Sequence, residues 1–256
     1  MRSTIKMSAM LMVAVVLFLT GCKDPAPATQ TGMLMFHLHT NLDADEVDAG
    51  DVHTNWNGKN IQLDRAQYYI SGVKLIKADN STVSVPGTIL VRMGQEIYMV
   101  GNAPVGTYKS LSFNVGVQPA DNHKAPATHS ATDDLSEQTP TMHFASTADG
   151  YIFMAVEGMI DSSAGGTGTP DKSFSYHIGT DALLKTVTMP DHSAAPYNTS
   201  FVVSATSGAT VHMMADYNKL FNTVDMSTNN ITNTTDINWI ATTLAGNIPN
   251  MFSYEE

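Results

Sequence analysis

Cysteine is almost missing from this chain. Its 256 residues contain one, Cys22, so no internal disulfide can form and no pair of thiolates can hold a metal. The P-loop, GxSxG, HExxH and CxxC patterns are also absent, and these are the strong sequence signals for nucleotide, hydrolytic and thiol chemistry. We therefore do not expect an enzyme. Use of His177 as a catalytic base is the least favoured interpretation, because the sequence places no nucleophile or carboxylate at a spacing from it that is typical of a catalytic pair.

Basic side chains are also scarce. The chain has 13 Lys and Arg residues against 24 Asp and Glu residues, which gives a formal net charge of −11. Removal of residues 1–21 would take away Arg2 and Lys6 and no acidic residue, leaving 11 basic against 24 acidic residues and a charge of −13. Such an acidic chain is a poor partner for nucleic acid, whose phosphates are bound by Lys and Arg.

The N-terminus has the pattern of a secretory signal. Arg2 and Lys6 precede the apolar run MLMVAVVLFLT, which is shorter than the roughly 20 residues of a transmembrane helix. The run ends in LTGC, which resembles the bacterial lipobox, so we expect residues 1–21 to be a lipoprotein signal peptide and Cys22 to be lipidated. The alternative is an ordinary signal peptide that happens to contain a cysteine.

The segment after this signal predicts a tether and a location. Residues 22–31, rich in Pro, Ala and Thr, are expected to form a flexible tether, followed by one folded domain over residues 32–256. We expect the protein in the bacterial cell envelope. Because Lys23 and not Asp follows the cysteine, a Gram-negative source would place it as an outer-membrane lipoprotein that faces the periplasm or the cell surface.

Short runs rich in Val, Ile, Thr, Tyr and Phe, separated by turn residues, predict a mainly β fold. Strands at this spacing are typical of a single-domain antiparallel β-sandwich or barrel. The expected strands are Gly32–His39, Gln67–Lys77, Thr82–Val85, Thr88–Arg92, Glu96–Val100, Tyr108–Val117, Tyr151–Glu157, Phe174–Ile178, Lys185–Met189, Ser200–Ala205 and Thr210–Met214.

Apolar residues with helical spacing appear only near the C-terminus. They predict a helix over Asp236–Phe252, with Thr235 as its N-cap, that packs on an open end or a face of the β domain. A shorter helical turn is expected over Ala215–Phe221, and loops over Asn122–Pro140 and Ser162–Lys172.

Histidine is the residue type that could carry chemistry. With the cysteine assigned to lipid, a soft or borderline metal could be held only by the nine His, the sixteen Met or the carboxylates. Imidazole suits Cu, Zn and Ni, and the Met thioether suits Cu(I). His37 and His39 stand at i and i+2 of an expected strand, so both side chains point to one face, as a metal site or as two solvated histidines.

Two other polar patterns favour plainer interpretations. His212 and Met214 also share one strand face, but methionine most often fills gaps in cores, and we expect a core or structural role for this pair. The acidic run Leu42–Asp51 lacks the glycine and the terminal glutamate of an EF-hand loop, which favours a solvated acidic loop over a calcium site.

Taken together, several collinear motifs resemble the methanobactin-associated copper-binding protein family (MbnP-like), which includes copper-binding proteins of methane oxidisers. The resemblance covers nearly the whole chain after the signal. The motifs are MLMFHLH, QYYISGVKLIKADNS, APVGTYKSLSFNVGV, the Asn122-His123 loop, GYIFMAVEG, FSYHIG, VHMMADYNKLF and LAGNIPNMF.

The resemblance implies a β-sandwich-like fold, no catalysis, and copper, as Cu(I) or Cu(II), bound by histidine. It maps family ligands onto His177 of HIG and His123 of the Asn-His loop, beside His37 and His39 of this chain. It also implies a di-haem cytochrome peroxidase-like partner that oxidises a tryptophan. Here Phe144 and Ser146 stand where tryptophans are usual, which puts that partner in doubt and offers His143 as a substitute ligand.

The leading hypothesis is thus a lipid-anchored envelope protein that binds copper through histidines, for buffering, storage or delivery. The alternative is a surface lipoprotein that binds a protein or glycan without metal. The two interpretations of His177, a ligand or a polar residue that ends a strand, are both open, with the ligand favoured.

Overall fold

The structure is a computed structural model, and it describes residues 29–233, 235 and 237–255. The expected signal peptide, Cys22 and the tether up to residue 28 lie outside the described residues. Among the residues that are described, no helix has both the length and the apolar character that a bilayer crossing requires.

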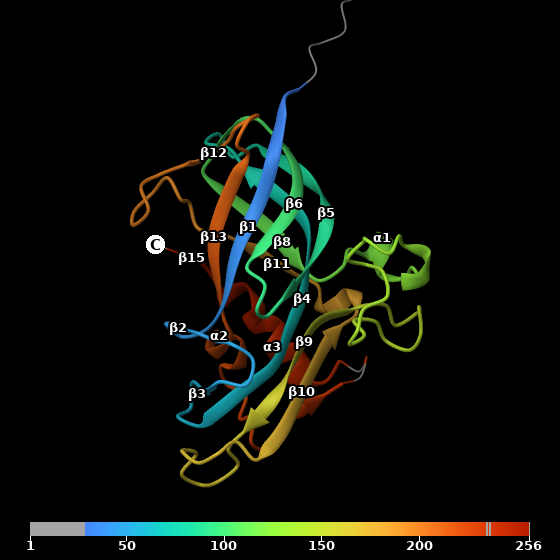
Figure 1. Cartoon of the computed structure of the whole chain (residues 1–256), viewed down its shortest axis with the longest axis vertical. Helices are drawn as coiled ribbons and strands as arrows, with labels where there is room; N and C mark the ends of the chain where they lie inside the picture. Colours follow the sequence, from blue (N-terminus) through green and yellow to red (C-terminus); the bar gives the residue numbers. More distant parts are fainter. Residues whose placement is uncertain (1–28, 234, 236, 256) are drawn as a thin grey trace, which may run out of the picture.

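Two curled sheets and a small ribbon make up the domain (Figure 1). The first sheet has the order β15-β13-β1-β2, and β6 pairs with the edge of β1 that is opposite β13. Its strands are β1 (Thr31–Leu42), β2 (Asp45–Glu46), β6 (Ile97–Pro104), β13 (Ala209–Asp216) and β15 (Phe252–Tyr254).

The second sheet has eight strands in the order β11-β8-β4-β9-β10-β14, with β3 and β5 also paired to the long strand β4. These strands are β3 (Val52–Thr54), β4 (Asn60–Ile76), β5 (Thr82–Arg92), β8 (Ser110–Val115), β9 (Ile152–Ile160), β10 (Lys172–Gly179), β11 (Lys185–Thr188) and β14 (Ile231–Thr232). The ribbon joins β7 (Gly106–Tyr108) to β12 (Phe201–Val203). The helical elements are α1 (Pro119–Asn122), η1 (Pro126–Thr128), η2 (Asp181–Leu183), α2 (Tyr217–Phe221), α3 (Trp239–Asn247) and η3 (Ile248–Asn250).

Aromatic side chains pack between the two sheets. Phe113 of β8 lies with its ring centroid 6.2 Å from that of Phe36 on β1 and 5.1 Å from that of Phe252 on β15. Tyr68 of β4 adds a second contact to Phe252, at 5.7 Å. All of these side chains are buried. The sheet that contains β1 therefore packs on the larger sheet through its inner face. The outer face of the same sheet takes no part in this contact.

The expected mainly β fold with a C-terminal helix is confirmed, with differences in detail. Two strand pairs, β1 with β13 and β10 with β14, are parallel. The two strands expected at Thr82–Val85 and Thr88–Arg92 are one strand, β5, which passes through Pro86 and Gly87 with an irregularity in its pairing to β4. Proline in an edge strand needs no partner for the N–H it lacks, so the strand continues.

The C-terminal helix is shorter than expected. Helix α3 begins after Asn238, whose side chain accepts a hydrogen bond from the backbone N–H of Ala241, so the N-cap expected at Thr235 is wrong. Pro249 interrupts the helical hydrogen bonding, and the chain passes through η3 into β15. The expected apolar stripe is buried at Ala241 and Leu244, and α3 contacts β10 and α2. The short helical turn expected near residues 215–221 is confirmed as α2.

The aromatic contact between the sheets generates a stability prediction. Phe113→Ala removes a fully buried ring that touches both Phe36 and Phe252, and we expect the free energy of unfolding to fall by about 3–5 kcal/mol. Urea denaturation followed by circular dichroism measures it. Phe201→Ala, at a partly buried ring on the β12 ribbon, is the matched control and should cost clearly less. Equal losses of unfolding free energy in the two variants would show that the Phe113 ring between the sheets contributes no more stability than a partly buried ring.

Candidate metal centre

The outer face of β1 presents two histidines side by side. Along this strand Leu34, Phe36 and Leu38 are buried, and the alternate positions His37 and His39 point outward, only partly covered. The ring centroids of His37 and His39 are 4.4 Å apart. The expectation that these two side chains share one face is confirmed by this geometry.

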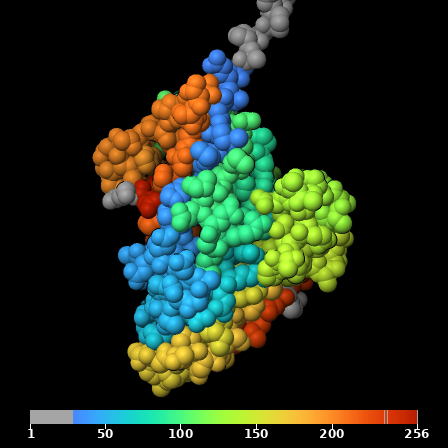
Figure 2. Space-filling view, in the orientation of Figure 1, coloured from blue at the N-terminus to red at the C-terminus, as the bar shows by residue number. Residues whose placement is uncertain are grey.

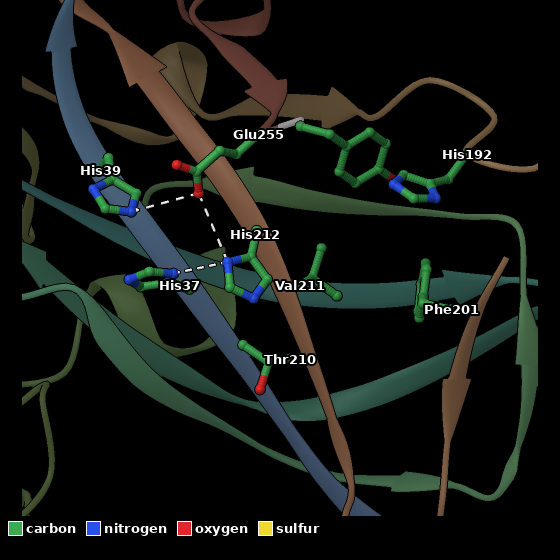
Figure 3. A pocket seen from close by; sticks show the side chains of 9 residues that line it. His37, His39, His192, Phe201, Thr210, Val211, His212 and Glu255 are labelled. Carbon is green, nitrogen blue, oxygen red and sulfur yellow. Dashed lines mark hydrogen bonds and ion pairs between the residues drawn. The ribbon is translucent and has the colours of Figure 1, made fainter. Parts of the chain in front are cut away.

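A third imidazole comes from β13, far away in the sequence. His212 is the register partner of His37 in the parallel β1–β13 pair, and the Nδ1 atoms of the two rings are 2.8 Å apart (Figure 3). The side chain of His212 is 53% exposed, so its interpretation as a core residue is wrong. Met213, the next residue, takes the buried position, and His212 therefore faces the same side as His37.

Three carboxylates surround the imidazoles. Glu255, just after β15, has its Oε2 atom 3.5 Å from Nε2 of His39 and 3.7 Å from Nδ1 of His212 (Figure 3). Its backbone N–H donates to the carbonyl of His212, which holds it against β13. On the far sides of the rings, Glu96 contacts Nε2 of His37 at 2.9 Å and Glu46 contacts Nδ1 of His39 at 2.8 Å.

The ring nitrogens thus divide into an inner and an outer set. The outer nitrogens of His37 and His39 bond to Glu96 and Glu46. Of the inner set, Nε2 of His39 is buried without a hydrogen-bond partner. Two overlapping groups, His37-His39-Glu96 and His37-His212-Glu255, each have their ligand atoms within 4.8 Å of one another. The residues present therefore fit a cation.

The local electrostatics favour positive charge. Burial by itself would lower the pKa of His39, but its hydrogen bond with Glu46 and the charges of Glu255, Glu46 and Glu96 raise it above its usual 6.5. The hydrogen bond from His37 lowers the pKa of the Glu96 carboxyl, so Glu96 is ionised at neutral pH. A cation placed among the imidazoles would benefit from the same negative surroundings.

A pocket of about 590 Å³ opens beside the imidazoles. Its lining includes His37, His39, His212 and Glu255, together with Phe201 and Tyr254. The centre is therefore reachable from solvent.

His177 lies elsewhere, on β10 of the eight-stranded sheet. Its Nε2 atom is 2.6 Å from Oε1 of Glu157, which also accepts a hydrogen bond from the buried Arg65 at 2.9 Å. Burial raises the pKa of Glu157, but the bond with His177 and the charge of Arg65 lower it overall. Among the described residues, His177 joins no group of three potential ligand atoms.

His123 and His143 also have partners of their own. His123 is paired with Asp181 at 3.1 Å, and the ring of His143 packs 4.9 Å from that of Tyr151. Neither belongs to a group of potential metal ligands in the described part of the chain. Phe144, at one of the positions where the resemblance expects tryptophan, covers Gly179 so closely that a β-carbon there would overlap its ring.

Sequence reasoning missed four members of the centre: His212, Glu255, Glu46 and Glu96. Glu46 belongs to the acidic run that was expected to be a solvated loop. The run is largely exposed, but it contains the strand β2, which pairs with the end of β1 and so brings Glu46 beside His39. The alternation of His212 with buried neighbours was the one signal that could have found a member of this set.

The fold and the site together define a mainly β protein with a histidine–carboxylate centre on the outer face of one sheet. The chain belongs to the MbnP family, whose model matches residues 31–237. Among solved structures, it is similar to MbnP from Methylosinus trichosporium, with 15% identity and a TM-score of 0.54 over 77% of this chain and 80% of that chain. At this identity the likeness shows the fold. A comparison with curated protein sequences finds no match.

The contact between Glu46 and His39 generates a prediction about protonation. Glu46→Gln removes the negative charge beside His39 and leaves the burial of the ring unchanged, so we expect the pKa of His39 to fall. Ring-proton NMR titration measures it, with Glu137→Gln, an exposed residue that is not among the partners of His39, as the control.

The same pKa carries a stability consequence. Because the pKa of His39 is raised in the folded protein, protonated His39 stabilises the folded state. This stabilisation is fully present below pH 6.5, the pKa of the unfolded chain, and it is lost as the pH rises through the pKa of the folded protein. In the Glu46→Gln variant, the stabilisation that protonated His39 contributes to the folded state should be smaller. A His39 pKa that does not move in this variant would contradict the assignment of Glu46 as its outer partner.

Proposed function

We propose that this chain binds copper at the outer face of β1, and that it buffers, stores or delivers the metal in the cell envelope. One observation supports this most: His37 and His212 come from strands 175 residues apart, yet their Nδ1 atoms approach to 2.8 Å, with Glu255 beside them. The two nitrogens are joined by a hydrogen bond, and a bound cation would take the place of the shared proton. Membership of the MbnP family is consistent with the proposal.

The residues that would hold the ion are His37 and His212 through Nδ1, His39 through Nε2, and Glu255 through Oε2. Glu96 and Glu46 accept hydrogen bonds from the remaining nitrogens of His37 and His39. Such outer carboxylates fix the tautomer and the orientation of a ligating imidazole and raise its basicity. Each ligand must be unprotonated to bind, so the affinity for metal falls as the pH falls through the raised pKa of His39.

The donor set indicates a divalent ion. Imidazole and carboxylate are borderline and hard donors, which suit Cu(II) and Zn(II). At such nitrogen and oxygen sites Cu(II) binds more tightly than the other first-row divalent ions. We therefore propose Cu(II) as the ion of the imidazole centre.

The proposal is tested by comparing two histidines. We expect His212→Ala to lower the affinity for Cu(II) by about 100-fold or more, because it removes a direct ligand, and loss of outer partners alone costs 10–100-fold. We expect His177→Ala, which removes a histidine bound to Glu157, to leave the affinity unchanged. Competition of the purified protein against a chromophoric Cu(II) chelator measures both.

The outcomes are distinct. A loss of copper in His177→Ala with none in His212→Ala would move the site to β10, where the family resemblance placed it. Weak binding that neither variant changes would remove the copper function and leave the alternative, a surface protein that binds a protein or glycan.

We also propose that lipid on Cys22 holds the protein at the membrane, as the LTGC motif indicates. In a Gram-negative host, Cys22→Ser should abolish the incorporation of fatty acid, because the thiol that would carry the lipid is gone. Metabolic labelling with a clickable fatty acid, followed by fractionation, measures this. Equal labelling of the wild-type chain and Cys22→Ser would exclude this anchor.

A further inference from the structure

Methionines occupy the outer face next to the imidazoles. On β1, Met33 and Met35 alternate with the buried Leu34 and Phe36, so they point to the same side as His37. On β6, Met99 is the register partner of Met35. This set, Met33, Met35 and Met99, is called the methionine triad below. Figure 2 shows β1 lying between β13 and β6 on the visible face of the molecule.

The triad is not part of the core. Met33 is 36% exposed and Met99 is 69% exposed, whereas their neighbours Leu34, Tyr98 and Val100 are buried. Methionine in a protein normally fills gaps in a packed interior. Three thioethers lie on one open face, at alternate positions of β1 and at the facing position of β6, and they therefore need an explanation other than packing.

The spacing allows the three sulfur atoms to converge. Residues directly opposite in an antiparallel pair, such as Met35 and Met99, have β-carbons about 4.5–5.5 Å apart. Residues i and i+2 of a strand, such as Met33 and Met35, are roughly 7 Å apart. The methionine side chain is unbranched and has three rotatable bonds, so each sulfur can turn towards a common point.

Thioether sulfur is a soft donor that selects soft ions such as Cu(I) over Cu(II), Zn(II) or hard cations. We propose that the methionine triad is a binding site for Cu(I). The face of this sheet then carries two kinds of donor in adjacent rows of the β-ladder: thioethers around Met35, and imidazoles around His37. This inference goes beyond the proposed function, because its donors are different and it holds whether or not the imidazoles bind copper.

The test uses a variant that keeps the apolar surface and removes only sulfur. Met33→Leu/Met35→Leu/Met99→Leu has nearly the same volume and hydrophobicity, so we expect it to fold. Ag(I), a soft ion that does not change its oxidation state here, is titrated into the purified protein, and Cu(I) is titrated anaerobically against a chromophoric chelator. We expect the wild-type chain to bind one more equivalent of either ion than the triple variant.

Two controls separate this site from its surroundings. Met93→Leu/Met159→Leu removes two partly buried thioethers outside the triad and should keep the extra equivalent. His37→Ala/His39→Ala/His212→Ala removes the imidazoles and should also keep it, while losing Cu(II). The methyl NMR signals of the triad should move when Ag(I) is added.

The proposal is overturned if the triple leucine variant binds Ag(I) and Cu(I) as the wild-type chain does, or if the triad's methyl signals stay in place. The first result would place the soft-ion donors elsewhere. The second would leave the exposed methionines as an apolar contact surface.

Discussion

The pairing of β1 with β13, β2 and β6 positions the candidate metal centre. Its inner residues, with Phe36 at the centre, pack against Phe113 of the larger sheet, and so they determine which side of the strand faces water. Because side chains alternate, a shift of one residue would bury the histidines and expose the core. The anchoring of Phe36 thus orients His37 and His39, and the parallel register with β13 then brings His212 to the same row.

The centre depends on contributions from elements that share no local sequence. β2 brings Glu46, the turn before β6 brings Glu96, and the end of β15 brings Glu255. Each carboxylate lies beside an imidazole. On His37 and His39, one ring nitrogen bonds to an outer carboxylate, and the other ring nitrogen faces the neighbouring imidazoles. This division is the arrangement that ligating histidines require. The formal net charge of the chain, −11, adds to the attraction for cations.

The sequence predicted the mainly β fold, the strand that carries HLH and the shared face of its two histidines, because alternation is a local signal. It could not predict that β13 pairs with β1 in parallel, since that pairing depends on long-range packing. The sequence therefore contained no sign that His212 would join His37, and its pairing with Met214 favoured a core or structural role. The C-terminal helix was placed too broadly, because Pro249 and the cap at Asn238 were given less weight than the apolar stripe. The histidines mapped by family resemblance, His123, His143 and His177, stand with partners of their own.

The long separation between His37 and His212 also bears on the order of events during synthesis. When β1 leaves the ribosome, it carries only two adjacent imidazoles, and the third ring follows 175 residues later. The complete centre therefore cannot exist until β13 and Glu255 have been synthesised. If the centre holds a metal as proposed, the ion would enter a finished chain and not a nascent one.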